Sequence, residues 1–355
     1  MKSIQQIDKN FRVDTAIEAE DLCWFDPTKA PFLLHGLLHD RSGYMRMDPD
    51  VAATVSEGVQ TLFRHTSGGR LSFETDSKYL AIHVKCGCRG DSSKMPMTGH
   101  SGFDLYRERN GRLEFVNIFI PPVQMKDGYE GIFYFNEPGP HKVLIHFPLY
   151  NTVETLQVGL QNASCVKRYS PYGNEAPVVF YGSSITQGGC VSRPGNSYPA
   201  IVSRFSGKDF ICLGFSGSAR GEQEMADYIA SLPMSAFVFD YDHNDCDNLP
   251  RLEARHELFY KTVRKAHPEI PIFIMSAPYA AYTFYEAYPA KSKTILYRTY
   301  ENAKAAGDKV FFIDGEFFFG EDKDAALTDR IHPNDLGHTC MAHAVLRVFA
   351  EAGIL

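Results

Sequence analysis

The chain has 355 residues, a length that suits two domains better than one. Hydrophobic residues make up 44% and charged residues 22%, which is typical of a globular protein with a substantial buried core. The net charge of −7 offers no electrostatic basis for binding nucleic acid or an anionic membrane, so we expect neither partner.

The N-terminal stretch, Met1 to Asp8, lacks the apolar core of a signal peptide, and no apolar run is long enough to cross a bilayer. These features predict a cytoplasmic protein. The 8 cysteines are scattered, and the close pair Cys86 and Cys88 has no second pair at zinc-site spacing. Reduced, buried thiols are the favoured interpretation, and we expect no metal site.

The first part of the chain, residues 1–162, contains short runs of apolar residues, several alternating with polar ones, separated by turn residues. Such alternation is typical of half-buried antiparallel strands. The clearest strand candidates are 70–74, 79–85, 115–120, 131–135 and 141–147. Strong helical periodicity is missing here, so we predict an all-β, jelly-roll-like sandwich domain.

A polar, turn-rich stretch at 163–177 is interpreted as a connector, and strand and helix patterns alternate in the remaining residues, 178–355. The strand candidates are 178–182, 210–214, 236–241, 271–276 and 309–314; the helix candidates are 197–205, 221–231, 251–266, 291–306 and 335–351. This order implies right-handed crossovers and a parallel sheet covered on both faces. We therefore predict a three-layer αβα, flavodoxin-like domain with five strands, whose ligand lies at their carboxyl ends.

The turn after the first of these strands carries the candidate nucleophile. The apolar run 178–181 is followed by the sequence Gly-Ser-Ser-Ile-Thr-Gln-Gly at 182–188. A serine such as Ser184, on a tight turn between a central strand and a helix, is exposed among backbone N–H groups, which suits a nucleophile. A Gly/Ser turn without chemistry explains this segment equally well when it is taken alone.

The ends of the next three strands add groups that could bind an anion or a substrate. The Gly-rich turn at 213–219 lets a backbone N–H point at an anion, and Asn244 could donate its side-chain N–H to an oxyanion. Its neighbour His243 is a candidate for substrate contact. Tyr279 and Tyr282, in the loop after the fourth strand, could stack on a sugar or line an acyl pocket. Taken alone, the Gly-rich turn is better explained as a plain helix-start turn, and packing against the neighbouring domain explains the tyrosines nearly as well.

Past the fifth strand, Asp329 and His332 lie three residues apart in the sequence Asp-Arg-Ile-His-Pro. The histidine can accept the proton of Ser184, and the aspartate can orient the imidazole and support its positive charge. Each segment is weak evidence alone. Together they place a nucleophile, oxyanion donors and an Asp/His pair on one edge of one sheet, which favours catalysis.

Residues 177–355 resemble the SGNH (GDSL-type) hydrolase family, whose four motif blocks occur here in order. The stretch 182–186 is similar to the nucleophile block, and Asp329 and His332 match the last block. The resemblance implies a Ser184–His332–Asp329 triad. Asp335 lies just beyond the last block as an alternative acid, and Asp329 is preferred because it matches the family spacing.

The same resemblance places the oxyanion glycine at Gly217 and the oxyanion asparagine at Asn244, with the Ser184 N–H as a third donor. Two positions depart from the family pattern. Ser183 stands where the family usually has Asp, and Asp242 stands where the third block usually begins with Gly. Neither change removes a proposed catalytic atom.

The sequence Gly-Phe-Asp-Leu-Tyr at 102–106 is similar to the signature of the β-sandwich domain that precedes some SGNH domains. Relatives with this layout are often two-domain carbohydrate esterases that remove acetyl groups. The resemblance therefore implies a serine esterase that hydrolyses short acyl esters of a small molecule or an oligosaccharide and needs no cofactor.

Two alternatives stay open at this point. An acyltransferase would use the same triad with a sugar or metabolite hydroxyl in place of water. A carbohydrate-binding protein with an inactive hydrolase domain is disfavoured by the intact Ser184, Asn244, Asp329 and His332. The sequence leaves the oligomeric state undetermined.

Overall fold

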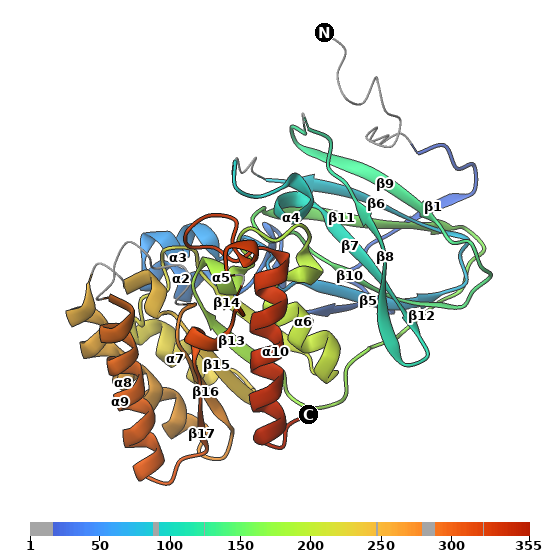
Figure 1. Ribbon diagram of the computed structural model, residues 1–355. Helices are drawn as coiled ribbons and strands as arrows, with labels where there is room; N and C mark the ends of the chain where they lie inside the picture. Colours follow the sequence, from blue (N-terminus) through green and yellow to red (C-terminus); the bar gives the residue numbers. More distant parts are fainter. Residues whose placement is uncertain (1–16, 88–91, 124, 246–247, 279–287, 322) are drawn as a thin grey trace.

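The computed structural model describes residues 17–87, 92–123, 125–245, 248–278, 288–321 and 323–355. Two bodies lie side by side, a pair of antiparallel sheets formed by the first half of the chain and an α/β layer structure formed by the second half (Figure 1). Among the described residues, no helix combines the length and the apolar character needed to span a bilayer.

The first body is a β-sandwich. One sheet contains β1 (Leu22–Phe25), β11 (Val153–Gln161), β6 (Tyr79–Cys86) and β9 (Gly128–Tyr134) in that order. The other contains β12 (Val166–Lys167), β5 (Arg70–Thr75), β10 (His141–His146), β7 (Phe103–Arg109) and β8 (Arg112–Phe119), with β2 (Leu33–His35) also pairing with β5. Apolar side chains from both sheets form one buried cluster, including Phe73, Ile82 and Val143. The predicted sandwich is confirmed, although β12 lies within the predicted connector.

The second body is built on a parallel sheet with the strand order β14 (Phe210–Gly214), β13 (Val178–Gly182), β15 (Ala236–Asp240), β16 (Ile272–Met275) and β17 (Val310–Ile313). This is the flavodoxin-like order. The predicted five-stranded αβα domain is confirmed, and the predicted strands agree with the observed ones to within one residue.

Helices cover both faces of this sheet (Figure 1). On one face lie α6 (Tyr198–Ser206) and α10 (Asp335–Glu351); on the other lie α7 (Gln223–Ser231), α8 (Leu249–Ala266) and α9 (Tyr288–Ala305). Successive side chains of β13 alternate between the two faces: Val178 and Phe180 pack in one core, and Val179 and Tyr181 in the other. Burial on both faces explains why the strand is apolar without interruption.

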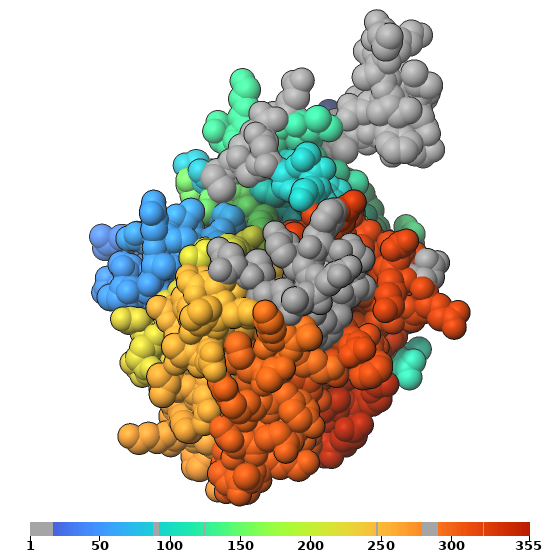
Figure 2. Space-filling view, turned by 60° about the vertical axis from the view of Figure 1, so that its left-hand side comes forward, coloured from blue at the N-terminus to red at the C-terminus, as the bar shows by residue number. Residues whose placement is uncertain are grey.

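Among the short helices of the first half of the chain that were not predicted are α2 (Pro49–Val55) and α3 (Glu57–Leu62). They pack on the α/β domain, where Ala52 and Val59 join the core that also contains the residues of α7. Figure 2 shows the blue surface of this segment beside the yellow surface of the α/β domain. Each helix has at most seven residues, too few for a helical period to be visible in the sequence.

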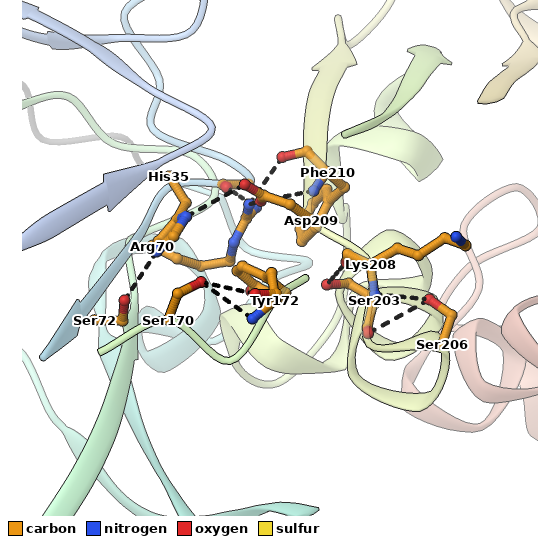
Figure 3. A network of polar contacts seen from close by, with 11 residues as sticks. His35, Arg70, Ser72, Ser170, Tyr172, Ser203, Ser206, Lys208, Asp209 and Phe210 are labelled. Atoms are coloured by element: carbon orange, nitrogen blue, oxygen red, sulfur yellow. Dashed lines mark hydrogen bonds and ion pairs between the residues drawn. The ribbon is translucent and has the colours of Figure 1, made fainter. Parts of the chain in front are cut away.

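A buried polar network joins the two domains at the start of β14 (Figure 3). The Arg70 guanidinium pairs with the Asp209 carboxylate, donates to the Phe210 carbonyl at 2.9 Å, and lies 3.8 Å from the Phe210 ring centroid. His35 Nδ1 lies 3.2 Å from the second oxygen of Asp209. Arg70 is fully buried, and its contact with Asp209 joins the sandwich to the edge strand of the parallel sheet.

Candidate active site

Ser184 is the first residue of α5 (Ser184–Gln187), a short helix that follows β13 directly. The Oγ of Ser183 accepts a 3.2 Å hydrogen bond from the Ile185 N–H and so caps the helix. Gly182 is needed at the end of the strand, because a Cβ there would lie 1.5 Å from the Asp240 carboxylate. The strand therefore turns sharply into a helix and places Ser184 at the carboxyl end of the sheet.

The structure brings Ser184, His332 and Asp329 together in one chain of hydrogen bonds. Ser184 Oγ lies 2.9 Å from His332 Nε2, and His332 Nδ1 lies 3.0 Å from Asp329 Oδ2. The backbone N–H groups of Ile331 and His332 donate to Asp329 Oδ1 at 2.8 Å and 2.7 Å. The turn that carries the two residues thus also holds the carboxylate facing the imidazole.

Asp329 is suited to remain ionised beside the imidazole. Burial alone would raise the pKa of its carboxyl group, but hydrogen bonds from Lys94 and from the backbone and side chain of His332 outweigh that effect and hold the pKa well below its usual range. An ionised carboxylate accepts only, so His332 Nδ1 must carry the proton and Nε2 is free to accept one from Ser184.

The alternative acid, Asp335, points elsewhere. Its carboxylate accepts hydrogen bonds from the N–H of Ser192 at 2.8 Å and from the Ser192 hydroxyl. Asp335 begins α10 and so fixes the loop after the nucleophile helix instead of contacting the His332 ring nitrogens.

Two of the candidate oxyanion donors are backbone N–H groups, those of Ser184 and Gly217. Within the described residues, neither the Ser184 N–H nor the Gly217 N–H donates a hydrogen bond to another protein group. Gly217 has a φ of +65°, and a Cβ there would have no neighbour within 4 Å. A side chain at this position would have room, so the left-handed backbone conformation is the reason that a glycine is favoured here.

Asn244 Nδ2 makes contacts that the sequence did not predict. It donates to the carbonyl oxygens of Phe215 and Ala219, both at 3.1 Å. These two residues bracket the turn that carries Gly217. Asn244 therefore holds this turn in place. To stabilise an oxyanion as well, its amide group must turn one N–H away from these carbonyl oxygens.

His243 is buried beside the triad. Burial, assisted by the nearby imidazole of His332, lowers the pKa of His243 to about 3, so its ring is neutral at physiological pH. It can shape the site but brings no charge to it. Tyr279 and Tyr282, the other predicted substrate contacts, lie outside the described residues. In the described part of the chain, no three His, Cys, Asp or Glu side chains gather closely enough to hold a metal ion.

The sequence of the α/β domain matches the model of the GDSL-like lipase/acylhydrolase family over residues 175–350. This part of the chain belongs to that family. Residues 22–166 match the family model described as the N-terminus of SGNH-hydrolase-type esterases. The two matches include the four motif blocks and the sandwich signature.

Solved structures of similar architecture include three instructive ones. A protein from Bacteroides ovatus described as a GDSL-like lipase is 26% identical, with a TM-score of 0.84 over 93% of this chain and 98% of that one. A salicylyl-acyltransferase from a tetracycline biosynthetic pathway is 20% identical, with a TM-score of 0.78 over 95% and 99%. An acetyl xylan esterase from the rumen bacterium Butyrivibrio proteoclasticus is 13% identical, with a TM-score of 0.58 over 94% and 99%. No curated protein matches the chain in sequence.

The two departures from the GDSL-like family pattern have structural explanations. Ser183 provides the cap of α5 that an aspartate could provide. Asp242 is buried, and burial raises the pKa of its carboxyl group to about 7. Its Oδ2 lies 3.4 Å from the Ala277 N–H and 3.3 Å from the Ser292 hydroxyl, so it ties the end of β15 to the next strand and to α9.

Several contacts to the nucleophile helix of the GDSL-like domain come from the sandwich domain and were missed by the sequence analysis. The Tyr150 hydroxyl donates to the Ser184 carbonyl at 3.1 Å, and the Ser67 hydroxyl donates to the Gln187 carbonyl at 2.7 Å. Gln187 Nε2 in turn donates to the Leu149 carbonyl at 3.2 Å. No local pattern marks these residues, because they depend on how the two domains dock.

Proposed function

We propose that this protein is a serine esterase that hydrolyses short-chain acyl esters, with acetyl esters of a carbohydrate as the favoured substrates. The observation that carries the proposal is the hydrogen-bond chain from Ser184 through His332 to Asp329, with distances of 2.9 Å and 3.0 Å. A nucleophile, a base and an orienting acid in this order are the arrangement that activates serine for acyl transfer.

In the first half of the proposed reaction, Ser184 Oγ attacks the ester carbonyl carbon while His332 Nε2 takes the hydroxyl proton. The carbonyl oxygen becomes an oxyanion, stabilised by the N–H groups of Ser184 and Gly217 and by the Asn244 amide. Collapse of this intermediate breaks the bond to the alcohol, and the imidazolium returns the proton to the leaving oxygen.

In the second half, water attacks the acyl-serine carbonyl and loses a proton to His332. The bond to Ser184 Oγ then breaks, the acid is released, and the serine is protonated again. Asp329 stays ionised throughout and supports the imidazolium in both halves. Each proton that is taken up is returned, so the cycle needs no redox partner.

The carbohydrate part of the proposal is supported by the structural relatives, because the acetyl xylan esterase shares the arrangement of both domains. At 13% identity this likeness concerns the fold, and we extend the substrate class to the present chain as a proposal. The family model of the N-terminal domain is consistent with it, since it describes the N-terminus of SGNH-type esterases.

An acyltransferase is the second candidate, favoured by one observation. The salicylyl-acyltransferase shares both domains at a TM-score of 0.78, which is higher than that of the acetyl xylan esterase. Hydrolysis and transfer use the same triad and differ in whether water or an alcohol attacks the acyl-serine. Incubation with an activated acyl donor and a series of sugar hydroxyls, followed by mass spectrometry, would separate the two.

The experiment that tests the esterase proposal compares p-nitrophenyl acetate hydrolysis by the wild type and by Ser184→Ala, with circular dichroism to establish that both are folded. We expect hydrolysis by the wild type, an acetylated Ser184 in the quenched protein, and loss of both in the variant. Equal rates in the two proteins, or none in either with acetate and longer acyl esters, would refute it. A transfer product with little hydrolysis would favour the acyltransferase.

A further inference from the structure

A lysine of the sandwich domain contacts the acid of the candidate triad. Lys94 Nζ lies 2.7 Å from Asp329 Oδ2, the same oxygen that lies 3.0 Å from His332 Nδ1. The contact spans 235 residues of sequence and the boundary between the domains. The carboxylate of Asp329 is therefore shared between the imidazole and a cation from the other domain.

The backbone around Lys94 is fixed against the GDSL-like domain. Met95 is buried in a small apolar cluster with Leu149 and with Val191, which follows the nucleophile helix. Immediately afterwards comes α4 (Met97–Ser101), where the Thr98 hydroxyl donates to the Ser192 carbonyl at 2.5 Å. A Cβ on Gly99 would lie 2.2 Å from the Val191 carbonyl, so the two backbones touch. The backbone at Lys94 is thus held beside the candidate active site.

Three titratable groups near the pair, His243, His338 and Cys190, are neutral at physiological pH. Burial lowers the pKa of His243 to about 3 and that of His338 to about 4. Burial, assisted by the charge of Asp329, raises the pKa of the Cys190 thiol to about 11. Two charged residues lie near in sequence: Asp335 binds Ser192, and Arg330 is exposed on the turn. Among the described residues, Lys94 places its ammonium group in direct contact with the Asp329 carboxylate.

We propose that Lys94 is a positioning residue of this active site, which holds the Asp329 carboxylate against His332 and offsets part of its negative charge. This inference rests on the proposed triad and adds to it a group from the sandwich domain. The physical reason is that a carboxylate in contact with an ammonium group supports a neighbouring imidazolium less strongly than an unpaired carboxylate does. Lys94 would therefore keep His332 unprotonated, and able to act as a base, down to a lower pH.

The first test is the pH dependence of kcat/KM for p-nitrophenyl acetate in the wild type, Lys94→Met and Lys94→Arg. In Lys94→Met we expect the acidic limb to move to higher pH by about 0.2–0.7 unit, the size of an exposed ion-pair interaction, with KM unchanged. Lys94→Arg keeps the charge and should retain the wild-type profile. Added salt should reduce the difference, because it screens exposed charges.

Lys85 offers a matched control. Its ammonium group lies 2.6 Å from Glu154 on the sandwich domain, and its side chain is 57% exposed, compared with 59% for Lys94. Lys85→Met removes an equivalent ion pair away from the triad and should leave the profile unchanged. In an Asp329→Asn background, Lys94→Met should have no further effect on the profile, because Lys94 acts through that carboxylate.

A second measurement separates this inference from the proposed function. The downfield proton NMR signal of His332 Nδ1–H, assigned with His332→Gln, reports the His332–Asp329 hydrogen bond without turnover. Its titration midpoint should rise in Lys94→Met even if the natural reaction is not ester hydrolysis. An unshifted midpoint would overturn the inference, as would a raised KM with an unshifted acidic limb, which would make Lys94 a substrate contact.

Discussion

The carboxylate of Asp104, fully buried in β7 of the sandwich, accepts a 2.8 Å hydrogen bond from the guanidinium of Arg193 in the GDSL-like domain. The same oxygen accepts the Gly195 N–H at 2.9 Å, and the Arg193 guanidinium also donates to the Tyr106 hydroxyl. Asp104 and Tyr106 are the polar members of the Gly-Phe-Asp-Leu-Tyr signature. The signature of the N-terminal domain therefore forms a joint with the loop that follows the nucleophile helix.

Removing one partner of this buried ion pair should lower the free energy of unfolding. Arg193→Met leaves the Asp104 carboxylate buried without its cation, and we expect a loss of about 3 kcal/mol in the free energy of unfolding. Asp104→Asn combined with Arg193→Met should recover part of that loss, because the double variant no longer buries an unpaired carboxylate at position 104. Denaturant unfolding of the three proteins would measure both effects. Equal stability of wild type and Arg193→Met would show that the pair contributes nothing.

The choice between the two candidate acids is testable by matched substitutions. Asp329→Asn removes the charge beside His332 and should lower kcat by roughly 10³–10⁴. Asp335→Asn perturbs a contact with Ser192 instead and should lower kcat less than tenfold. Steady-state kinetics at the wild-type optimum would distinguish them. A larger loss in Asp335→Asn would reverse the assignment.

Asn244→Ala should lower kcat by roughly 10²–10³ with little change in KM, because an oxyanion donor acts mainly in the transition state. Since Asn244 also holds the 215–219 turn, a control must disturb that turn alone. Ser218→Ala does so, because the Ser218 hydroxyl donates to the Ser216 carbonyl at 3.2 Å. If both variants lose activity equally, Asn244 acts through the turn and not as a donor.

A buried histidine away from the site should contribute to acid sensitivity. His256 is 1% exposed, and burial lowers its pKa from 6.5 to about 3. The unfolded chain then binds the proton more readily, so the stability that depends on neutral His256 is complete above about pH 6.5 and is lost as the pH falls towards 3.

We therefore expect the stability loss between pH 7 and pH 5 to be smaller in His256→Gln than in the wild type, by about 2 kcal/mol. Denaturant unfolding at the two pH values would measure it. His343→Gln, which alters an exposed histidine on α10, is the control and should retain the wild-type pH dependence. The same dependence in His256→Gln and the wild type would contradict the burial argument.

Periodicity and turn chemistry in the sequence were sufficient for the parallel sheet and for the position of its candidate site. Strands buried on both faces appear as uninterrupted apolar runs, as at 178–181, and their carboxyl ends lie on one edge of the sheet. Ser184 and the Asp329–His332 pair were candidates at that edge, and the preference for Asp329 over Asp335 rested on the family resemblance. Short helices such as α2 escaped detection because fewer than two turns show no periodicity.

Local patterns specify strands and turns, so the groups at the strand ends could be read from the amino-acid sequence. The part of the site that crosses between the domains became visible only in the folded chain. The contacts of Lys94 with Asp329 and of Tyr150 with Ser184 join segments more than 30 residues apart, and in one case 235. Such contacts arise from the docking of two separately patterned surfaces, and no local sequence period records that docking.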